Sequence, residues 1–89
     1  MKAVITVVGK DTVGILATVS GECAKFRVNI VEVSQTILQD MFCMIMLCDI
    51  KDVSVPFTNF ASEIKGCGQD KGLVIHVMHE DIFNSMHRI

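Results

Sequence analysis

The stretch Ala3–Ile30, AVITVVGKDTVGILATVSGECAKFRVNI, decides the fold of this 89-residue chain. Its first segment, Ala3–Val8, is rich in β-branched residues and is bounded by Gly9, which predicts a strand. A helix is predicted next, because four apolar residues recur at helical spacing: Ile15, Val19, Cys23 and Phe26. Asn29 follows the end of this helix, and a second strand begins at Ile30. The stretch therefore predicts a strand–helix–strand unit.

The second strand of this unit is followed by two more predicted strands. Ile30–Leu38 is predicted to be a strand, with Val31, Val33 and Ile37 on one parity, and the turn Gln39–Asp40 leads into the next strand. That next strand, Met41–Asp49, is apolar on both parities, so we expect it to be central and covered on both faces. A last strand is predicted at Leu73–His79, after the glycine-rich connection Gly66–Gly72.

Two further helices are predicted. The first carries an apolar stripe and ends at Gly66, with Ser54 as its N-cap and Pro56 in its first turn. Its stripe consists of Phe57, Phe60, Ala61 and Ile64. The second is a short terminal helix, Glu80–Ile89, which begins with acidic residues as the helix dipole favours. Its apolar face is formed by Ile82, Phe83, Met86 and Ile89.

The predicted order, βαββαβ plus a short C-terminal helix, is typical of a ferredoxin-like two-layer α+β sandwich. We expect one domain over residues 1–89. Right-handed crossovers place both long helices on one face of the sheet. The other face then needs a cover, and four residues are candidates to point there: Met44, Met46, Val74 and Met78. This uncovered face favours a homodimer.

Composition narrows the classes of function. Hydrophobic residues make up 51% of the chain and charged residues only 20%, which favours burial of apolar surface between subunits. The net charge is −2 and no basic run exists, so no nucleic-acid partner is expected. The longest apolar run, Met41–Cys48, is too short to span a membrane, and the N-terminus lacks the features of a signal peptide. We therefore expect a cytoplasmic protein with reduced thiols.

The loop Gly9–Ile15, GKDTVGI, joins the first strand to the first helix. Exposed N–H groups at a helix N-terminus favour an anion such as a carboxylate. The sequence lacks the Lys and Ser/Thr of a phosphate-binding loop after Gly14, which disfavours a nucleotide. Two interpretations of Asp11 stay open, because this residue either caps its own helix or contributes to a ligand site. Asn29 is open in the same way, as a helix-exit residue or as an amide that holds a ligand.

No group of residues has the spacing of an active site or a metal site. The four cysteines form no CxxC pair, and Cys43 and Cys48 face opposite sides of one strand, as do His76 and His79. Buried structural thiols are the favoured interpretation of the cysteines. No serine has a base at a recognisable spacing. The sequence therefore predicts no enzyme, no metal and no cofactor.

The loop GKDTVGI, the amphipathic helix after it and the triplet Val28–Ile30 resemble an ACT domain. Two further segments, Val33–Thr36 and the C-terminal Asp81–Ile89, resemble a narrower family of stand-alone, ACT-only proteins of about ninety residues. That family is similar to the ACT segments of the glycine cleavage system transcriptional regulator and of formyltetrahydrofolate deformylase. The resemblance covers essentially the whole chain.

The resemblance implies a regulatory module that senses a small molecule. ACT domains usually dimerise, and in the side-by-side arrangement two sheets join into one with the ligand at the seam. The effector, often an amino acid, contacts the loop after the first strand and the residue after the first helix of the neighbour. The resemblance assigns the loop contacts to Asp11, Gly14 and Ile15, and those after the helix to Asn29 and Ile30. Since no second domain is expected in the chain, the resemblance implies that ligand binding regulates a separate protein.

Two positions depart from the family pattern. Val13 stands where many ACT domains have proline, and Arg27 stands where many have glycine. A positive φ at Arg27 costs on the order of 1 kcal/mol, and a different helix end would move Asn29. A ligand-free interaction subunit with the same dimeric fold is the alternative to a sensor, and an enzyme is the third and weakest hypothesis.

Overall fold

The computed structural model describes residues 1–10 and 13–86. Its main elements are β1 (Lys2–Lys10), α1 (Ile15–Lys25), β2 (Asn29–Leu38), β3 (Met41–Asp49), α2 (Phe57–Cys67), β4 (Val74–His79) and α3 (Glu80–Met86). A short 3-10 helix, Gln69–Lys71, lies in the connection between α2 and β4. The predicted order is confirmed, and the chain has the ferredoxin-like α+β fold with a short C-terminal helix.

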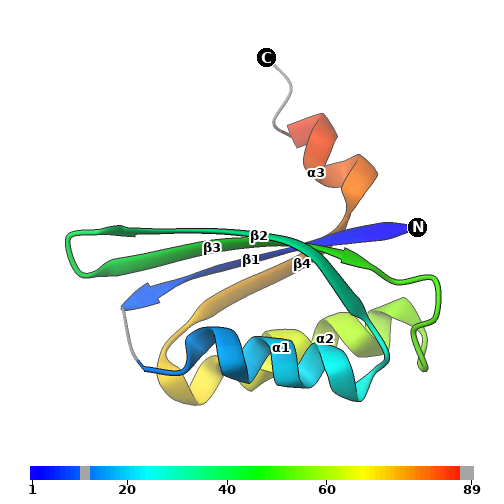
Figure 1. Ribbon diagram of the computed structural model, residues 1–89, viewed down its shortest axis with the longest axis horizontal. Helices are drawn as coiled ribbons and strands as arrows, with labels where there is room; N and C mark the ends of the chain where they lie inside the picture. The colour runs from blue at the N-terminus through cyan, green and yellow to red at the C-terminus, as the bar shows by residue number, and fades with distance from the viewer. Residues whose placement is uncertain (11–12, 87–89) are drawn as a thin grey trace.

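The four strands form one antiparallel sheet in the order β2-β3-β1-β4. Helices α1 and α2 lie side by side on one face of this sheet, while α3 rises from the opposite face (Figure 1). The prediction that both long helices share a face is therefore confirmed. The two outer strands, β2 and β4, have one free edge each within the described chain.

Strand register shows which side chains face the helices. Ile5 of β1 lies opposite Met46 of β3, and Val7 lies opposite Met44. All four side chains are buried, with exposed fractions of 0–1%. Residues that lie directly opposite one another point to the same face. The expectation that Met44 and Met46 face the uncovered side is therefore wrong, because these methionines form the centre of the core between the sheet and the helices.

The core also takes buried residues from the helices. Helix α1 contributes Ile15, Val19 and Cys23, and α2 contributes Phe60 and Ile64. The ring of Phe26, just past the end of α1, meets the ring of Phe60 edge-on at a centroid distance of 6.0 Å. No charged or polar side chain is buried among the described residues, so this core is held by apolar packing.

The start of α2 differs from the prediction. Its N-cap is Pro56, which has extended geometry, and not Ser54. The backbone N–H of Ser54 donates instead to the carbonyl oxygen of Phe26, at 3.0 Å, which ties the segment before α2 to the end of α1. The first helical hydrogen bond then runs to the carbonyl oxygen of Pro56 from Phe60, at 3.1 Å. The helix ends at Cys67, one residue beyond Gly66.

The face of the sheet away from α1 and α2 is only partly covered. β3 is central as predicted, but Met41 and Ile45 on this face are exposed, so β3 is not covered on both faces. Val74 also lies on this face and is exposed, and Met78 lies on it half-buried, as predicted for both. We call this surface the open face.

No helix in the described part of the chain is long and apolar enough to cross a membrane.

Candidate functional site

The loop between β1 and α1 ends in a helix whose N-cap is a glycine. Gly14 is this N-cap, with φ 86° and ψ 12°, and among the described residues no side-chain cap bonds to this end of α1. Glycine adopts this left-handed geometry without steric cost. Gly14, and not Asp11, occupies the N-cap position of α1, which begins at Ile15. Residues 11–12 lie outside the described residues, so the structure places no side chain for Asp11.

The first turn of α1 has backbone N–H groups that form no bond within the helix. The first helical hydrogen bond runs from the N–H of Thr18 to the carbonyl oxygen of Gly14, at 2.9 Å. The N–H groups of residues 15–17 precede that bond and have no partner within the helix. No acidic residue lies in this first turn. Ile15 as a whole is only 2% exposed and packs into the core, whereas the next two residues, Leu16 and Ala17, are exposed.

The other glycine of the loop, Gly9, lies in close contact with another segment of the same chain. Gly9 is buried at the end of β1, and a Cβ atom there would come within 2.7 Å of Leu73 Cδ2 and 3.2 Å of the carbonyl oxygen of Gly72. The absence of a side chain at Gly9 therefore lets the segment before β4 approach β1 closely.

The end of α1 fixes the position of Asn29. The N–H of Val28 donates to the carbonyl oxygen of Cys23 at 3.0 Å, and the N–H of Arg27 donates to that of Ala24 at 3.1 Å. These two bonds form a Schellman motif, in which the residue after the helix is left-handed. That residue is Arg27, with φ 63°. Of the two alternatives left open by the sequence, a positive φ at Arg27 or a different helix end, the structure has the first, and Asn29 is the first residue of β2.

Asn29 and Ile30 lie on the edge strand of the sheet. Asn29 is exposed and lies opposite Asp49, and Ile30 is half-buried opposite Cys48. Beyond them a β-bulge between Ile30 and Glu32 shifts the register of β2. This bulge separates Val31 from the parity of Val33 and Ile37, with which it was predicted to align.

One chain does not bring the two halves of the predicted site together. Gly14 and Ile15 lie at the start of α1, while Asn29 and Ile30 follow its end. A helix of 11 residues is roughly 16 Å long. This length exceeds the reach of a single amino acid between the two groups. A ligand that contacts both therefore requires two copies of the chain.

The electrostatics beside Asn29 involve the chain terminus. The N–H of Lys51 donates to Asp49 Oδ1 at 3.0 Å. This hydrogen bond, the Met1 ammonium group and Lys2 hold the pKa of Asp49 below its usual range. The Asp49 carboxylate, which lies opposite Asn29 at the beginning of β2, therefore already interacts with groups of its own chain.

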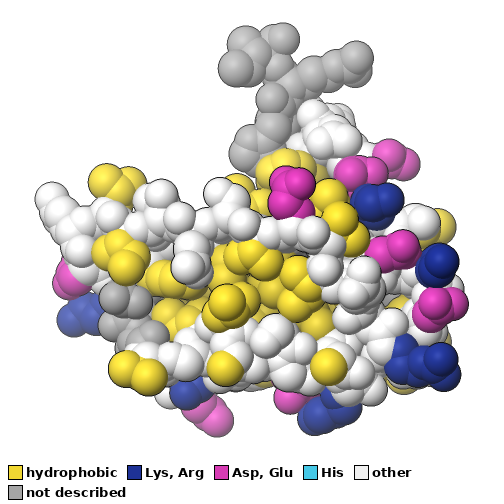
Figure 2. Space-filling model, in the orientation of Figure 1, with side chains coloured by type: hydrophobic (Ala, Val, Ile, Leu, Met, Phe, Trp, Pro, Cys, Tyr) yellow, Lys and Arg dark blue, Asp and Glu magenta, His cyan; other side chains and the backbone are white. Residues whose placement is uncertain are grey.

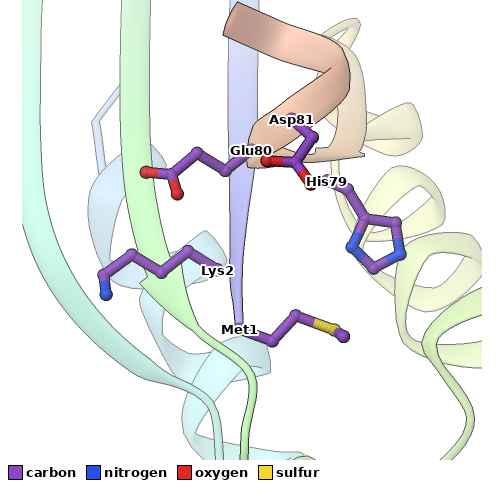
Figure 3. Close-up of a pocket in the computed structure, with 5 residues that line it drawn as sticks. All are labelled: Met1, Lys2, His79, Glu80 and Asp81. Carbon is purple, nitrogen blue, oxygen red and sulfur yellow. The ribbon is translucent and has the colours of Figure 1, made fainter.

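A small pocket that the sequence did not suggest lies at the same end of the sheet. Its volume is about 160 Å³, and it is lined by Met1, Lys2, His79, Glu80 and Asp81. Lys2 and Glu80 extend in the same direction, and His79 lies on the other side of the pocket (Figure 3). The imidazole of His79 stacks on the ring of Phe57 with a centroid distance of 4.2 Å. The pocket is distinct from the predicted site residues.

A second, shallow pocket of about 360 Å³ lies between α1 and α2 and is lined by Glu22, Lys25, Ser62, Glu63, Gly66 and Cys67. Lys25 Nζ and Glu22 Oε1, both on α1, form a salt bridge at 3.2 Å. Burial, followed by the charge of Glu22, raises the pKa of Cys67. This pocket contains none of the predicted site residues either.

Two of the four thiols lie in the core and two are half-buried. All four cysteines are free, and Cys23 and Cys48 are fully buried. A hydrogen bond with Cys48, together with burial, raises the pKa of Cys23. Cys43 lies on the open face and Cys48 faces the helices, as their spacing predicts. No group of three metal-binding side chains occurs among residues 1–10 and 13–86.

Comparison with known proteins places the chain in a family. The ACT domain family model matches residues 2–78. A UPF0237 protein of Listeria monocytogenes is 47% identical over 89 residues, which is 100% of both chains. A UPF0237 protein of Clostridium perfringens is 51% identical over 89 residues, again 100% of both chains.

Solved structures share the fold. An ACT domain protein from Streptococcus pneumoniae superposes with a TM-score of 0.80 at 40% identity, over 98% of each chain. A formyltetrahydrofolate deformylase from Pseudomonas putida gives a TM-score of 0.79 at 11% identity, over 91% of this chain and 30% of that one. A glycine cleavage system transcriptional repressor gives 0.72 at 24% identity, over 85% and 43%. The last two show the fold alone. From its sequence match and its structure, the chain belongs to the ACT domain family and, within it, to the UPF0237 proteins.

Proposed function

We propose that this chain is a regulatory module that binds an amino acid between two copies of itself and thereby controls a separate protein. The observation that carries the proposal is the separation of Gly14 and Asn29 at the two ends of α1. Each end offers groups suited to a ligand, but no ligand of amino-acid size reaches both within one chain. Two copies in a two-fold arrangement meet this requirement.

Strand β2 is the surface through which we propose that the copies pair. It is an edge strand, and every residue from Val31 to Leu38 is exposed. Its helix-facing side carries Val33 and Ile37, and Leu16 of α1 is exposed nearby. Hydrophobic side chains gather between β2 and α1 on this side of the molecule (Figure 2). A long, apolar edge strand is otherwise prone to aggregation, so a partner strand is expected to cover it.

Antiparallel pairing of β2 with its copy supports a composite site. In such a pair the beginning of one strand lies beside the end of the other. Asn29 begins β2, whereas Leu38 ends it, at the end of the sheet where β1 also finishes and the loop to α1 starts. The pairing therefore brings Asn29 of one copy toward the loop and the α1 N-terminus of the other.

The groups at this seam match the functional groups of an amino acid. In the proposal the ligand carboxylate accepts hydrogen bonds from the open N–H groups at the start of α1. The carboxylate of Asp11 pairs with the ligand ammonium group, and the Asn29 amide hydrogen-bonds to a remaining polar group of the ligand. Ile30 contributes apolar contact beside Asn29.

Regulation follows because the ligand contacts both copies. A ligand that binds one arrangement of the dimer more tightly than another shifts the population toward the first. The size of this shift is set by the difference between the ligand's affinities for the two arrangements. ACT segments in the repressor and the deformylase named above support a link to amino-acid or one-carbon metabolism. We propose no catalytic role for this chain.

A thermal-shift panel tests the proposal. The panel contains the twenty amino acids together with glycine-pathway and folate metabolites. A ligand that binds only the folded protein adds about 2.7 kcal/mol at 100 times its Kd, and each kcal/mol raises the Tm of a domain this small by about 4–8 °C. We expect a clear shift with at least one amino acid. No shift with any compound at millimolar concentration would favour the ligand-free interaction subunit instead.

A further inference from the structure

The open face carries an apolar patch at one end of the sheet. We call it the open-face patch, and it consists of Val8, Leu38, Met41, Ile45 and Val74, with exposed fractions of 38% to 66%. Register places these residues on one face, because Val8 lies opposite Val74 and Leu38 lies opposite Met41. The patch thus crosses all four strands at the end of the sheet where β1 finishes and β4 begins.

Polar side chains and Cys43 lie between the members of this patch. The described residues that fill the same face between its members are Thr6, Ser34, Thr36, Cys43 and His76. Lys10 lies at the rim, at the end of β1 and on the same parity as Val8, and Asp40 lies in the turn between Leu38 and Met41. A flat, largely apolar surface of this kind on a small protein marks an interaction site.

Helix α3 projects from the same face at the opposite end of the sheet. It follows β4 directly, packs against β1 and β4, and rises away from the sheet (Figure 1). Its Ile82 side chain is 53% exposed. Glu80 and Asp81 lie in its first turn, and no basic residue lies in its last turn. The open face therefore combines a projecting acidic helix at one end with a bare apolar surface at the other.

We infer that the open-face patch binds α3 of a second copy of this chain, and that the contact is reciprocal. A two-fold axis parallel to the sheet and perpendicular to its strands turns one open face toward the other. The same rotation reverses the strand direction, so each α3 lies over the bare end of the other sheet. Ile82 contacts the patch in this arrangement, and Glu80 and Asp81 meet a rim that carries Lys10.

The area of this contact is that of a small interface. Four strands span about 14 Å across the sheet, and Met41 to Ile45 span about 14 Å along it. One patch and the surface that covers it then bury about 400 Å² together, and two reciprocal contacts bury about 800 Å². That value is typical of a weak interface, to which the opposite signs of Lys10 and the α3 carboxylates add complementarity.

This interface uses a different surface from the proposed β2 seam. β2 pairing extends the sheet sideways and leaves both open faces on the same side. Packing of two such paired sheets through their open faces closes a tetramer with three mutually perpendicular two-fold axes. The inference goes beyond the proposed function and does not depend on a ligand.

The mass of the assembly in solution tests the inference. Sedimentation equilibrium at micromolar concentration compares the wild type with Ile45→Lys in the patch and Ile37→Lys on β2. Ile45 and Ile37 are 43% and 57% exposed, so neither lysine is buried in a single chain. Ser62→Lys on the exposed surface of α2 adds the same charge elsewhere. Circular dichroism checks that each variant is folded.

We expect the wild type at about four times 9.8 kDa and Ser62→Lys at the same mass. Ile45→Lys and Ile37→Lys are each expected to halve the mass, and the double variant is expected to be a monomer. A wild-type dimer that Ile45→Lys converts to a monomer also supports the open-face interface, and then the β2 seam fails. An Ile45→Lys variant with the wild-type mass overturns the inference, whatever Ile37→Lys does.

A third variant tests the role of α3. Ile82→Lys is expected to lower the mass as much as Ile45→Lys. In the inferred interface Ile82 of one copy packs against the patch of the other copy, and Ile45 belongs to that patch. An Ile82→Lys variant that keeps the wild-type mass while Ile45→Lys dissociates contradicts the assignment of α3 as the bound element.

Discussion

Gly14 and Asn29 lie at opposite ends of α1, the first as its N-cap and the second three residues beyond its C-cap, Phe26. The backbone N–H groups of residues 15–17 have no partner within α1, and Asn29 is exposed. An 11-residue helix holds them roughly 16 Å apart in any one chain. A ligand site that uses both groups is therefore a property of the assembly.

Replacement of Asn29 separates a ligand contact from a structural role. Asn29→Ala is expected to abolish the thermal shift by the effector, and to change the free energy of unfolding without ligand by no more than about 0.5 kcal/mol, since the side chain is exposed. Differential scanning fluorimetry with and without effector measures both quantities. Asn59→Ala, at an exposed position in α2, is the matched control and is expected to keep the shift. A loss of about 0.5–2 kcal/mol with the shift retained would identify Asn29 as a helix-exit residue only.

Arg27 is expected to limit the stability of the fold. Its φ of 63° is left-handed, which costs a side-chain-bearing residue about 1 kcal/mol. Arg27→Gly is therefore expected to raise the free energy of unfolding by about 0.5–1 kcal/mol, as measured by urea denaturation. Lys25→Gly, in the last turn of α1, is expected to lower it by about 1 kcal/mol. If Arg27→Gly also destabilises the protein, the Schellman end of α1 is not the structure in solution.

The assignment of strand faces predicts unequal effects of two methionine substitutions. Met46 is 0% exposed against the helices, whereas Met41 is 40% exposed on the open face. Met46→Ala is expected to cost about 2–5 kcal/mol, because it leaves a cavity in the core. Met41→Ala is expected to cost less than about 1 kcal/mol when the protein is dilute enough to be dissociated. Equal costs under those conditions would argue against the observed register.

Acid is expected to act on the fold through Asp49. The hydrogen bond from the Lys51 N–H, together with the Met1 ammonium group and Lys2, lowers the pKa of Asp49 in the folded state. A lowered folded pKa stabilises the protein above the unfolded pKa of about 3.9, and this contribution is lost as pH falls through the folded value. Asp49→Asn is therefore expected to flatten the decrease of unfolding free energy below about pH 4.

Urea denaturation between pH 2 and pH 7 measures this dependence. Asp52→Asn, at an exposed position three residues after Asp49, controls for the loss of one carboxylate. The prediction fails if Asp49→Asn and Asp52→Asn have the same profile as the wild type.

The sequence predicts the fold well because its apolar spacing is regular. The stripe of α1 and the β-branched runs of β1 and β2 specify elements whose order fits one topology. Residue parity is harder to assign in β3, since Met41–Asp49 is apolar on both faces. Only the register with β1 shows that Met44 and Met46 are buried by the helices and that Met41 and Ile45 are not.

The candidate site is predicted less completely. Arg27 adopts the left-handed geometry that the motif requires, so the position of Asn29 follows from the sequence. The N-cap of α1 does not follow from the sequence. An aspartate before a helical pattern is a stronger N-cap signal than a glycine, yet α1 starts after Gly14. The open-face patch and the pocket at the start of α3 depend on how α3 leaves the sheet, which no spacing in the sequence specifies.

Mixing two defective variants tests the central claim most directly. Asp11→Ala and Asn29→Ala are each expected to lose effector binding, as measured by isothermal titration calorimetry. In a mixed dimer one site carries both substitutions and the other carries neither. If the site spans two copies, unfolding and refolding the two variants together restores about one quarter of the wild-type binding sites, because half of the dimers are mixed. If both ligand contacts lie within one chain, the mixture contains no intact site and binding stays absent, which would contradict the account.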